Sequence, residues 1–249
     1  MATQSREVPP EIIEILKSSQ RVAVLTGAGI SAESGVPTFR EAQTGLWSRF
    51  DPAELATPQA FHQNPKLVWE WYTWRRELIS RAQPNPGHYA LVEMETIFPE
   101  FTLITQNVDG LHRLAGSHAT IELHGDISRT RCSFENQIIS DWPETDEIPP
   151  HCPHCGELLR PDVVWFGESL PAEPLEAAFE AASSCQVFLS IGTSTLVEPA
   201  ASLPFVALRN EAAVIEINPQ ETPLTPLASY SSKHAAGEIL PRLVTAIKS

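Results

Sequence analysis

Basic residues are scarce in this chain. Its 249 residues include 17 Lys and Arg against 31 Asp and Glu, so the formal net charge is −14. Proteins that hold nucleic acid or anionic membranes by electrostatic attraction present a basic surface, and this composition therefore argues against both kinds of partner. An anionic ligand must be met by a local positive site.

Long apolar runs, repeats and low-complexity tracts are missing from the sequence. No run approaches the roughly 18–20 residues that cross a bilayer, and residues 1–7 lack the apolar stretch of a signal peptide. We therefore expect a cytoplasmic protein. Cysteine is also scarce, but two of the four cysteines form a C-x-x-C pair, which favours a metal or redox role over a structural disulfide.

Short apolar, β-rich runs recur along the chain, and a polar or glycine-containing segment follows each one. The runs cover residues 22–25, 101–105, 187–191 and 214–217, and a helix-like segment, 175–184, precedes the third. This alternation is typical of an α/β fold with a parallel sheet. Ligands bind at the carboxyl ends of parallel strands, so the four following segments are predicted to line one crevice.

Two stretches interrupt this alternation. Residues 66–81 form a predicted amphipathic helix, and residues 132–155 are polar, rich in proline and without periodicity. We interpret both as inserts in the α/β domain. Together they are expected to build a second, smaller domain.

The segment after the first run is glycine-rich. Gly27-Ala28-Gly29-Ile30-Ser31-Ala32 matches the G-x-G-x-x-A pattern, which lets backbone approach a pyrophosphate at the start of a helix. A tight turn between a strand and a helix explains the same glycines equally well. A convincing ribose-binding acid about 20 residues downstream is missing, so a plain dehydrogenase is not supported.

Reactive and polar side chains gather at two further points. Gln106, Asn107 and Asp109 crowd directly after a predicted buried strand, which favours a polar pocket over a simple Asx turn. His124 lies in Leu123-His124-Gly125-Asp126, and histidine is a natural general base because it titrates near neutral pH. Most single histidines are structural, and only its neighbours make His124 stand out.

The cysteines give an incomplete zinc pattern. Cys152 and Cys155 form one knuckle, and 19 residues separate it from Cys132, a normal distance between knuckles. The other knuckle carries Glu135 where a cysteine belongs.

Two outcomes are open for this site. Zinc could persist with Glu135, His151 or His154 as the fourth ligand, since carboxylate and imidazole both bind zinc. Alternatively the site is empty, and packing around Phe134 and Trp142 holds the loop.

Taken together, these segments resemble the sirtuins, the family of NAD-dependent protein lysine deacylases. The resemblance extends from about residue 11 to residue 244, and its motifs stand in family order. They are Gly27-Ala28-Gly29-Ile30-Ser31-Ala32-Glu33-Ser34-Gly35-Val36-Pro37-Thr38-Phe39-Arg40, Thr105-Gln106-Asn107-Val108-Asp109-Gly110-Leu111-His112, Leu123-His124-Gly125, Val163-Val164-Trp165-Phe166-Gly167-Glu168, Gly192-Thr193-Ser194 and Ile217-Asn218. Thr38 departs from the Asp that many members carry, but Thr is common in one subgroup.

The resemblance implies a Rossmann-like large domain over residues 1–40, 90–127 and 161–249. The small domain would combine a helical module (41–89) with a zinc-ribbon-like module (128–160), whose metal would bind Cys132, Cys152 and Cys155 and serve structure. Acyl-lysine proteins or peptides would enter between the domains and meet NAD. We expect a monomer, with no nucleic-acid or membrane partner.

The resemblance also assigns roles to single residues. The cofactor site would comprise Gly27, Ala28, Gly29, Phe39, Arg40, Gln106, Asn107, Asp109, Gly192, Thr193, Ser194 and Asn218. Asn107 and Asp109 would help to expel nicotinamide while the acyl oxygen attacks the ribose. His124 would then take a proton from a ribose hydroxyl, and the products would be free lysine, nicotinamide and an O-acyl-ADP-ribose. Val163, Trp165 and Phe166 would hold the acyl-lysine and pair with substrate backbone.

The acyl preference depends on the predicted helix 66–81. Tyr72 and Arg75 share a helix face, and sirtuins that prefer succinyl, malonyl or glutaryl lysine carry Tyr and Arg at this spacing. Arg offers a fork for a carboxylate and Tyr a hydroxyl, while Ala56 leaves room for a longer chain. On the residues alone, Arg75 would be a surface residue paired with Glu70 or Glu77. Arg76 is expected to be its ordinary surface neighbour.

Three functions compete at this stage. The resemblance implies a deacylase that prefers negatively charged acyl groups and retains deacetylation. ADP-ribosyl transfer needs the same NAD pocket and is the alternative. The third candidate function is a non-catalytic NAD-sensing module. The presence of Asn107, Asp109 and His124 argues against it.

Overall fold

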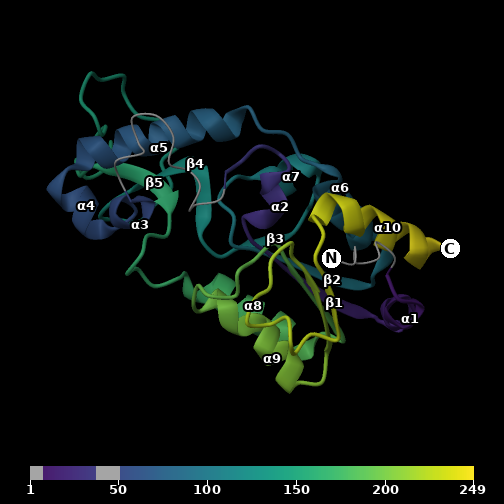
Figure 1. Cartoon of the computed structure of the whole chain (residues 1–249). Helices are drawn as coiled ribbons and strands as arrows, with labels where there is room; N and C mark the ends of the chain where they lie inside the picture. The colour runs from purple at the N-terminus through teal and green to yellow at the C-terminus, as the bar shows by residue number, and fades with distance from the viewer. Residues whose placement is uncertain (1–7, 38–50) are drawn as a thin grey trace.

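The protein is described from a computed structural model that covers residues 8–37 and 51–249. Its centre is a six-stranded sheet in the order β3-β2-β1-β6-β7-β8, in which every neighbouring pair is parallel (Figure 1). The strands are β1 (Arg21–Thr26), β2 (Glu100–Thr105), β3 (Thr120–Glu122), β6 (Val187–Ile191), β7 (Ala213–Ile217) and β8 (Tyr230–Ser232). The α/β fold with a parallel sheet is therefore confirmed.

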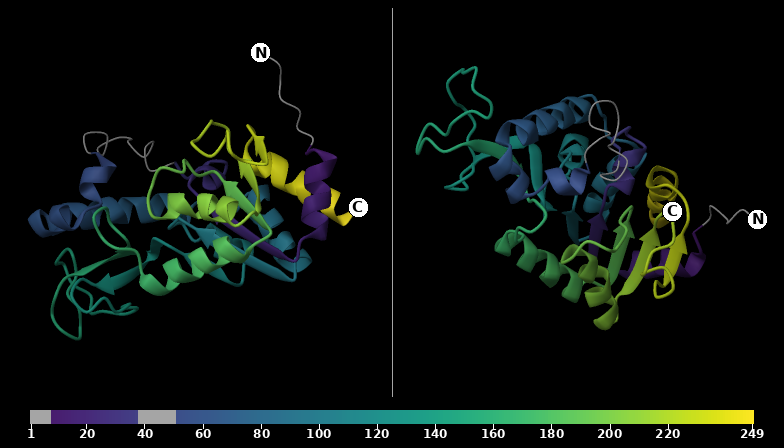
Figure 2. Two further views of the ribbon diagram at one scale, coloured as in Figure 1. Left: turned by 90° about the horizontal axis from the view of Figure 1, so that it is seen from below. Right: turned by 60° about the vertical axis from the view of Figure 1, so that its left-hand side comes forward.

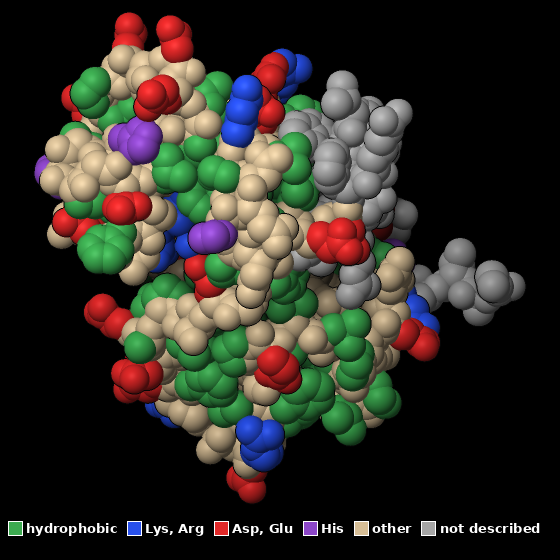
Figure 3. Space-filling view, turned by 90° about the vertical axis from the view of Figure 1, so that its left-hand side faces the viewer, with side chains coloured by type: hydrophobic (Ala, Val, Ile, Leu, Met, Phe, Trp, Pro, Cys, Tyr) green, Lys and Arg blue, Asp and Glu red, His purple; other side chains and the backbone are tan. Residues whose placement is uncertain are grey.

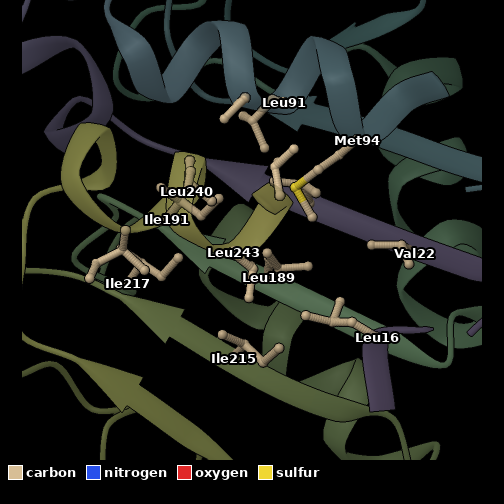
Figure 4. Packing of buried hydrophobic residues seen from close by; sticks show 14 of the residues in the cluster. Leu16, Val22, Leu91, Met94, Leu189, Ile191, Ile215, Ile217, Leu240 and Leu243 are labelled. Atoms are coloured by element: carbon tan, nitrogen blue, oxygen red, sulfur yellow. The ribbon is translucent and has the colours of Figure 1, made fainter. Parts of the chain in front are cut away.

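Helices cover both faces of this sheet. One face packs against α1 (Pro10–Ser18), α6 (Pro86–Ile97) and α10 (Ala236–Lys248), and the other against α8 (Ala172–Ser184), the 3₁₀ turn η2 (Ala200–Ser202) and α9 (Leu203–Arg209). Figure 4 shows the first core, where Leu16, Leu91, Met94, Leu240 and Leu243 meet strand residues such as Val22, Leu189 and Ile215. Alternate strand residues point to opposite faces, so a strand buried on both sides is apolar throughout.

A second group of elements lies beside the main sheet, on the left of Figure 1 and in both views of Figure 2. It consists of α3 (Pro52–Leu55), α4 (Pro58–Gln63), α5 (Pro65–Ser80) and an antiparallel pair, β4 (Gly125–Cys132) with β5 (Leu159–Val163). Its own core includes Phe61, Val68, Trp71, Tyr72 and Trp165.

Local sequence explains where α4 and α5 begin. Thr57 Oγ1 accepts from Ala60 N over 3.1 Å, and Asn64 Oδ1 accepts from Leu67 N over 3.1 Å. Proline follows each cap at the first helical position, where its missing N–H costs no hydrogen bond. These caps fix the start of α5, the helix that presents Tyr72 and Arg75.

Arg76 joins α5 to β4, and the expectation of an ordinary surface residue was wrong. Its Nε donates to Ile127 O over 2.5 Å, and its Nη2 donates to Arg129 O over 2.8 Å and Thr130 Oγ1 over 3.0 Å. The register of β4 against β5 shifts between Asp126 and Thr130. The guanidinium therefore bonds to carbonyls at an irregularity of the ladder, which local sequence does not reveal.

None of the helices in the described part of the chain has the length and apolar character that crossing a membrane requires.

Candidate active site

The segments that follow β1, β2, β6 and β7 meet at one edge of the sheet, as predicted. Gln106 Nε2, after β2, donates to Thr193 Oγ1 over 2.9 Å. Asn218 Nδ2, after β7, donates to Thr193 O over 2.7 Å. Thr193 is thus held from both sides, while Ser194 beside it is partly exposed.

The glycines let the segments after β1 and β6 touch backbone to backbone. Gly29 N donates to Gly192 O over 2.8 Å, and a Cβ on Gly29 would stand 2.6 Å from Gly192 Cα. Gly192 has φ +60, and a Cβ there would stand 2.5 Å from Ile30 N. Only glycine fits such an approach without displacement. The G-x-G pattern of Gly27 and Gly29 therefore has a packing reason in addition to any role toward a ligand.

A polar network connects the residues after β2 to α2 (Gly29–Ala32). Asn107 Nδ2 donates to Gly27 O over 3.1 Å and to Ser31 Oγ over 3.2 Å. Ser31 Oγ donates to Asp109 Oδ2 over 2.7 Å, and Leu111 N donates to Asp109 Oδ1 over 2.9 Å. Ser31 is the site residue that sequence reasoning left without a role, although its hydroxyl lies inside the glycine motif.

Burial raises the pKa of the Asp109 carboxyl, and the nearby Asp126 acts in the same direction. The Leu111 N–H, the Ser31 hydroxyl and the Arg75 charge oppose that rise. Asp109 is therefore an acid whose charge depends on its hydrogen bonds and on Arg75.

His124 faces the same crevice with a defined tautomer. Its Nδ1 lies 2.8 Å from Gln106 O, a carbonyl that can only accept, so the proton sits on Nδ1. Nε2 is then left with a lone pair. Burial lowers the pKa of His124, which keeps the ring neutral at physiological pH, and the bond to Gln106 opposes this shift.

Tyr72, Arg75 and Trp165 lie together between α5 and the segment after β5. Trp165 Nε1 donates to Tyr72 Oη over 3.0 Å, and both side chains are buried. The Arg75 guanidinium lies 5.0 Å from the centre of the Trp71 ring and 5.6 Å from that of Tyr72. Burial lowers the pKa of Arg75, while Tyr72 and Asp109 oppose this.

The two acids that would pair with Arg75 on the protein surface, Glu70 and Glu77, pair with other residues. Glu70 pairs with Lys66 at 3.8 Å, and Glu77 pairs with Arg81 on the exposed face of α5. The Arg75 guanidinium instead lies over the rings of Trp71 and Tyr72.

The segment from Val163 to Phe166 is anchored by its own N–H groups. Val164 N donates to His124 O over 3.0 Å, and Phe166 N donates to Ala56 O over 2.9 Å. Trp165 N donates to a Glu168 carboxylate oxygen over 2.8 Å. A peptide added here as a strand must therefore bond to carbonyl oxygens of these residues or to neighbouring groups.

Three cysteines and Glu135 form a compact cluster. The sulfurs of Cys132, Cys152 and Cys155 and a Glu135 carboxylate oxygen lie within 4.8 Å of one another. Cys132 and Cys152 are buried, whereas Glu135 and Cys155 are exposed. Three thiols and one carboxylate are a donor set that suits tetrahedral zinc.

Neither predicted histidine belongs to this cluster within the described chain. His151 Nδ1 lies 2.6 Å from Gly156 O, and its Nε2 faces Glu147 at 3.4 Å. The alternative of a packed loop finds partial support, because Trp142 packs against the small core that contains Cys132 and Cys152, but Phe134 is 74% exposed. Figure 3 looks onto this end of the molecule, where acidic and apolar side chains share the surface.

Phe39 and Arg40, predicted for the cofactor site, lie outside the described residues, as does Thr38. One groove of about 470 Å³ lies between α6 and α10, and another of about 450 Å³ lies beside β3, β4 and α8 and includes Gly125 and Val164 next to His124.

The model of the Sir2 family matches residues 27–199 of this chain. The chain belongs to the Sir2 family. The resemblance to the sirtuins is thereby confirmed, and the motifs inside the matched range are those around which the crevice is built.

Relatives of this Sir2 family member cover nearly its whole length. An NAD-dependent protein deacylase of Aquifex aeolicus is 58% identical over 216 residues, which is 86% of this chain and 90% of the relative. One from Pyrococcus abyssi is 50% identical over 245 residues, covering 96% and 97%.

Solved structures agree with these sequence matches. A Sir2 homolog–NAD complex superimposes with a TM-score of 0.91 at 45% identity, covering 99% of this chain and 96% of the other. A Sir2–peptide–NAD+ complex superimposes with a TM-score of 0.81 at 29% identity, covering 95% and 97%.

Proposed function

We propose that this chain is an NAD-dependent protein-lysine deacylase that prefers acyl groups ending in a carboxylate, such as succinyl, malonyl and glutaryl, and that also removes acetyl. Its family and the names of its relatives support the NAD-dependent deacylation. One observation carries the acyl preference: Arg75 lies half-buried beside Tyr72 on α5, at the border of the core that also holds Trp165.

The polar crevice fits NAD by its chemistry. Gln106 bonds to the Thr193 hydroxyl and Asn218 to the Thr193 carbonyl, at the carboxyl ends of strands, where nucleotides bind in such sheets. Bound NAD supplies a ribose carbon that becomes electrophilic as nicotinamide leaves.

Two side chains of the protein, Asn107 and Asp109, are held in place where nicotinamide is proposed to leave. Asn107 is held by Gly27 O and Ser31, and Asp109 is held by Ser31 and the Leu111 N–H. We assign both side chains to the amide group of nicotinamide, because Asn107 Oδ1 and the Asp109 carboxylate can both accept from its NH2. Their fixed positions mean that little reorganisation is needed when nicotinamide binds.

His124 is assigned as the general base. Its Nδ1–H bond to Gln106 O leaves Nε2 as a proton acceptor, and its lowered pKa keeps that nitrogen unprotonated near neutral pH. His124 O also accepts from Val164 N, so the base and the substrate-binding segment are tied together.

Arg75 and Tyr72 are assigned to the far end of the acyl chain. Tyr72 Oη accepts from Trp165 Nε1, so its own proton is available to a carboxylate. Arg75 adds a fixed positive charge in a protein of net charge −14, where an anionic group otherwise finds little attraction. The buried Ala56 contributes a small side chain at the same core.

Cys132, Glu135, Cys152 and Cys155 are proposed to bind one zinc ion with a structural role. The ion would tie the knuckle after β4 to the one before β5. We assign it no part in the chemistry.

Product analysis tests this proposal. The protein, NAD and a succinyl-lysine peptide should yield free lysine, nicotinamide and O-succinyl-ADP-ribose in equal amounts, and His124→Tyr should abolish all three while the protein stays folded. Nicotinamide release with ADP-ribose attached to a protein acceptor, and no free lysine, would replace the proposal by ADP-ribosyl transfer.

A further inference from the structure

A series of buried hydrogen bonds ends at the main chain of Asn107. The Asn107 N–H donates to Thr105 Oγ1 over 3.0 Å, and the Thr26 hydroxyl donates to the same oxygen over 2.8 Å. Thr26 Oγ1 lies 2.9 Å from His112 Nε2 on α7 (Leu111–Ala115). Thr26, Thr105 and His112 are all buried. The series thus runs from α7 across the ends of β1 and β2 to the loop that carries Asn107.

A second histidine adjoins the series. His88 on α6 is fully buried, and its ring centre lies 4.9 Å from that of His112. Its Nδ1 accepts from Asn85 N over 3.3 Å, within the cap of α6, so its proton is on Nε2. Burial lowers the pKa of His88 to about 4 and that of His112 to about 3, so both rings are neutral at pH 7.

The neighbouring rings fix the direction of the hydrogen bonds. Within the described chain, His88 Nε2 and His112 Nδ1 are the buried ring nitrogens without a partner. With His112 donating through Nε2 to Thr26, its Nδ1 is an acceptor next to the His88 donor. The reverse direction would place two buried N–H donors on adjacent rings without an acceptor, which is costly.

We infer that His112 is a positioning residue: its Nε2–H donates to Thr26, Thr26 donates to Thr105, and this series holds the main chain of Asn107 in place. The inference rests on the proposed function for the role of Asn107. Nothing in it requires His112 to touch substrate or NAD. A shift of Asn107 would also disturb its side-chain bonds to Gly27 and Ser31 and, through Ser31, the position of Asp109.

A double-mutant cycle tests the series. His112→Leu and Thr26→Val each remove one link and leave a buried group without its partner, so each should lower kcat about tenfold with little change in the KM for peptide. The double variant should also be about tenfold slower, because both changes break the same series. His112→Gln, whose amide nitrogen can replace Nε2–H, should recover kcat to within about threefold of the unaltered protein.

Ser190→Ala is the matched control. Ser190 on β6 is a buried hydroxyl without a partner among the described residues, and it lies outside the series. Its kcat should stay within about twofold of the unaltered protein. A double variant about a hundredfold slower, or a His112→Gln variant as slow as His112→Leu, would overturn the inference.

A spectroscopic readout separates this inference from the proposed function. Nitrogen NMR of the full chain labelled in histidine should show His112 protonated on Nε2 and unprotonated on Nδ1, and Thr26→Val should shift the Nε2 resonance. An Nδ1–H tautomer of His112 would overturn the inference even if deacylation is observed. An Nε2–H tautomer in a protein without deacylase activity would keep the series and refute the proposed function alone.

Discussion

Arg75→Met is the change that isolates the proposed acyl preference. Methionine keeps much of the apolar stem that packs beside Trp71 and Tyr72 but removes the charge and its hydrogen-bond donors. Arg75 is half-buried, so a substrate carboxylate bonded to it is partly shielded from water and salt. Losing a hydrogen bond between charged groups in such a place costs about 2–3 kcal/mol, or about 30- to 150-fold in kcat/KM.

The assay compares succinyl and acetyl forms of one peptide. The kcat/KM for the succinyl peptide should fall by that factor, mainly through KM, while the acetyl peptide changes less than about threefold. Arg81→Met is the matched control, since Arg81 stands at the C-terminal cap of the same helix but pairs with Glu77 in solvent, and its loss should affect neither peptide. An equal loss on both peptides would refute the reasoning, because it would show that Arg75 supports the site as a whole.

Three further predictions follow from the geometry. Burial lowers the pKa of His124, so its base form persists below the ordinary histidine pKa of about 6.5. The kcat/KM for an acetyl peptide should therefore fall only at pH values beneath about 6.5. A fall centred at or above that value would contradict the assignment of His124 as the base. Gly192→Ala should lower the free energy of unfolding by at least about 2 kcal/mol and raise the KM for NAD, whereas Gly35→Ala, with φ +77 but no atom within 4 Å, should cost about 1 kcal/mol and leave that KM unchanged. Elemental analysis of protein purified without added metal should find nearly one zinc ion per chain, and a chelator should lower the Tm. Protein that is folded but contains no zinc would contradict the proposed metal site and would mean that packing alone holds the loop around Glu135.

The main sheet was predictable because its signal is local. Strands buried on both faces are continuous apolar runs, and β1, β2, β6 and β7 each end at a glycine or polar segment. The periodicity of α5 was equally clear, and the observed bounds, Pro65–Ser80, differ by one residue at each end from the predicted 66–81. The strands β3 and β8 have three residues each, too few for a pattern to appear.

The unpredicted features are contacts between residues far apart in sequence. Ser31 bonds to Asp109 because parallel strands bring the two loops together, and Arg76 bonds to β4 where that strand shifts its register. The N–H groups of Val164 and Phe166 donate to two distant places in the chain, His124 and Ala56, and that of Trp165 donates to Glu168 in the following turn. The spacing of residues along the sequence does not indicate which distant residues will form such hydrogen bonds.

Several expectations stay predictions. The domain boundaries are among these predictions. Strand β4 (Gly125–Cys132) runs across the predicted boundary between residues 127 and 128, and β5 (Leu159–Val163) runs across the one between residues 160 and 161. A cytoplasmic location, a monomeric state and the roles of single site residues belong to the same group.

Mass spectrometry of matched acetyl-, succinyl- and glutaryl-lysine peptides, with and without NAD, tests the central claim most directly. We expect deacylation only with NAD, and a higher kcat/KM for the succinyl and glutaryl peptides than for the acetyl peptide. Removal of acetyl alone would contradict the carboxylate-binding role of Arg75 and Tyr72. Deacylation that proceeds equally without NAD would contradict the proposed chemistry itself.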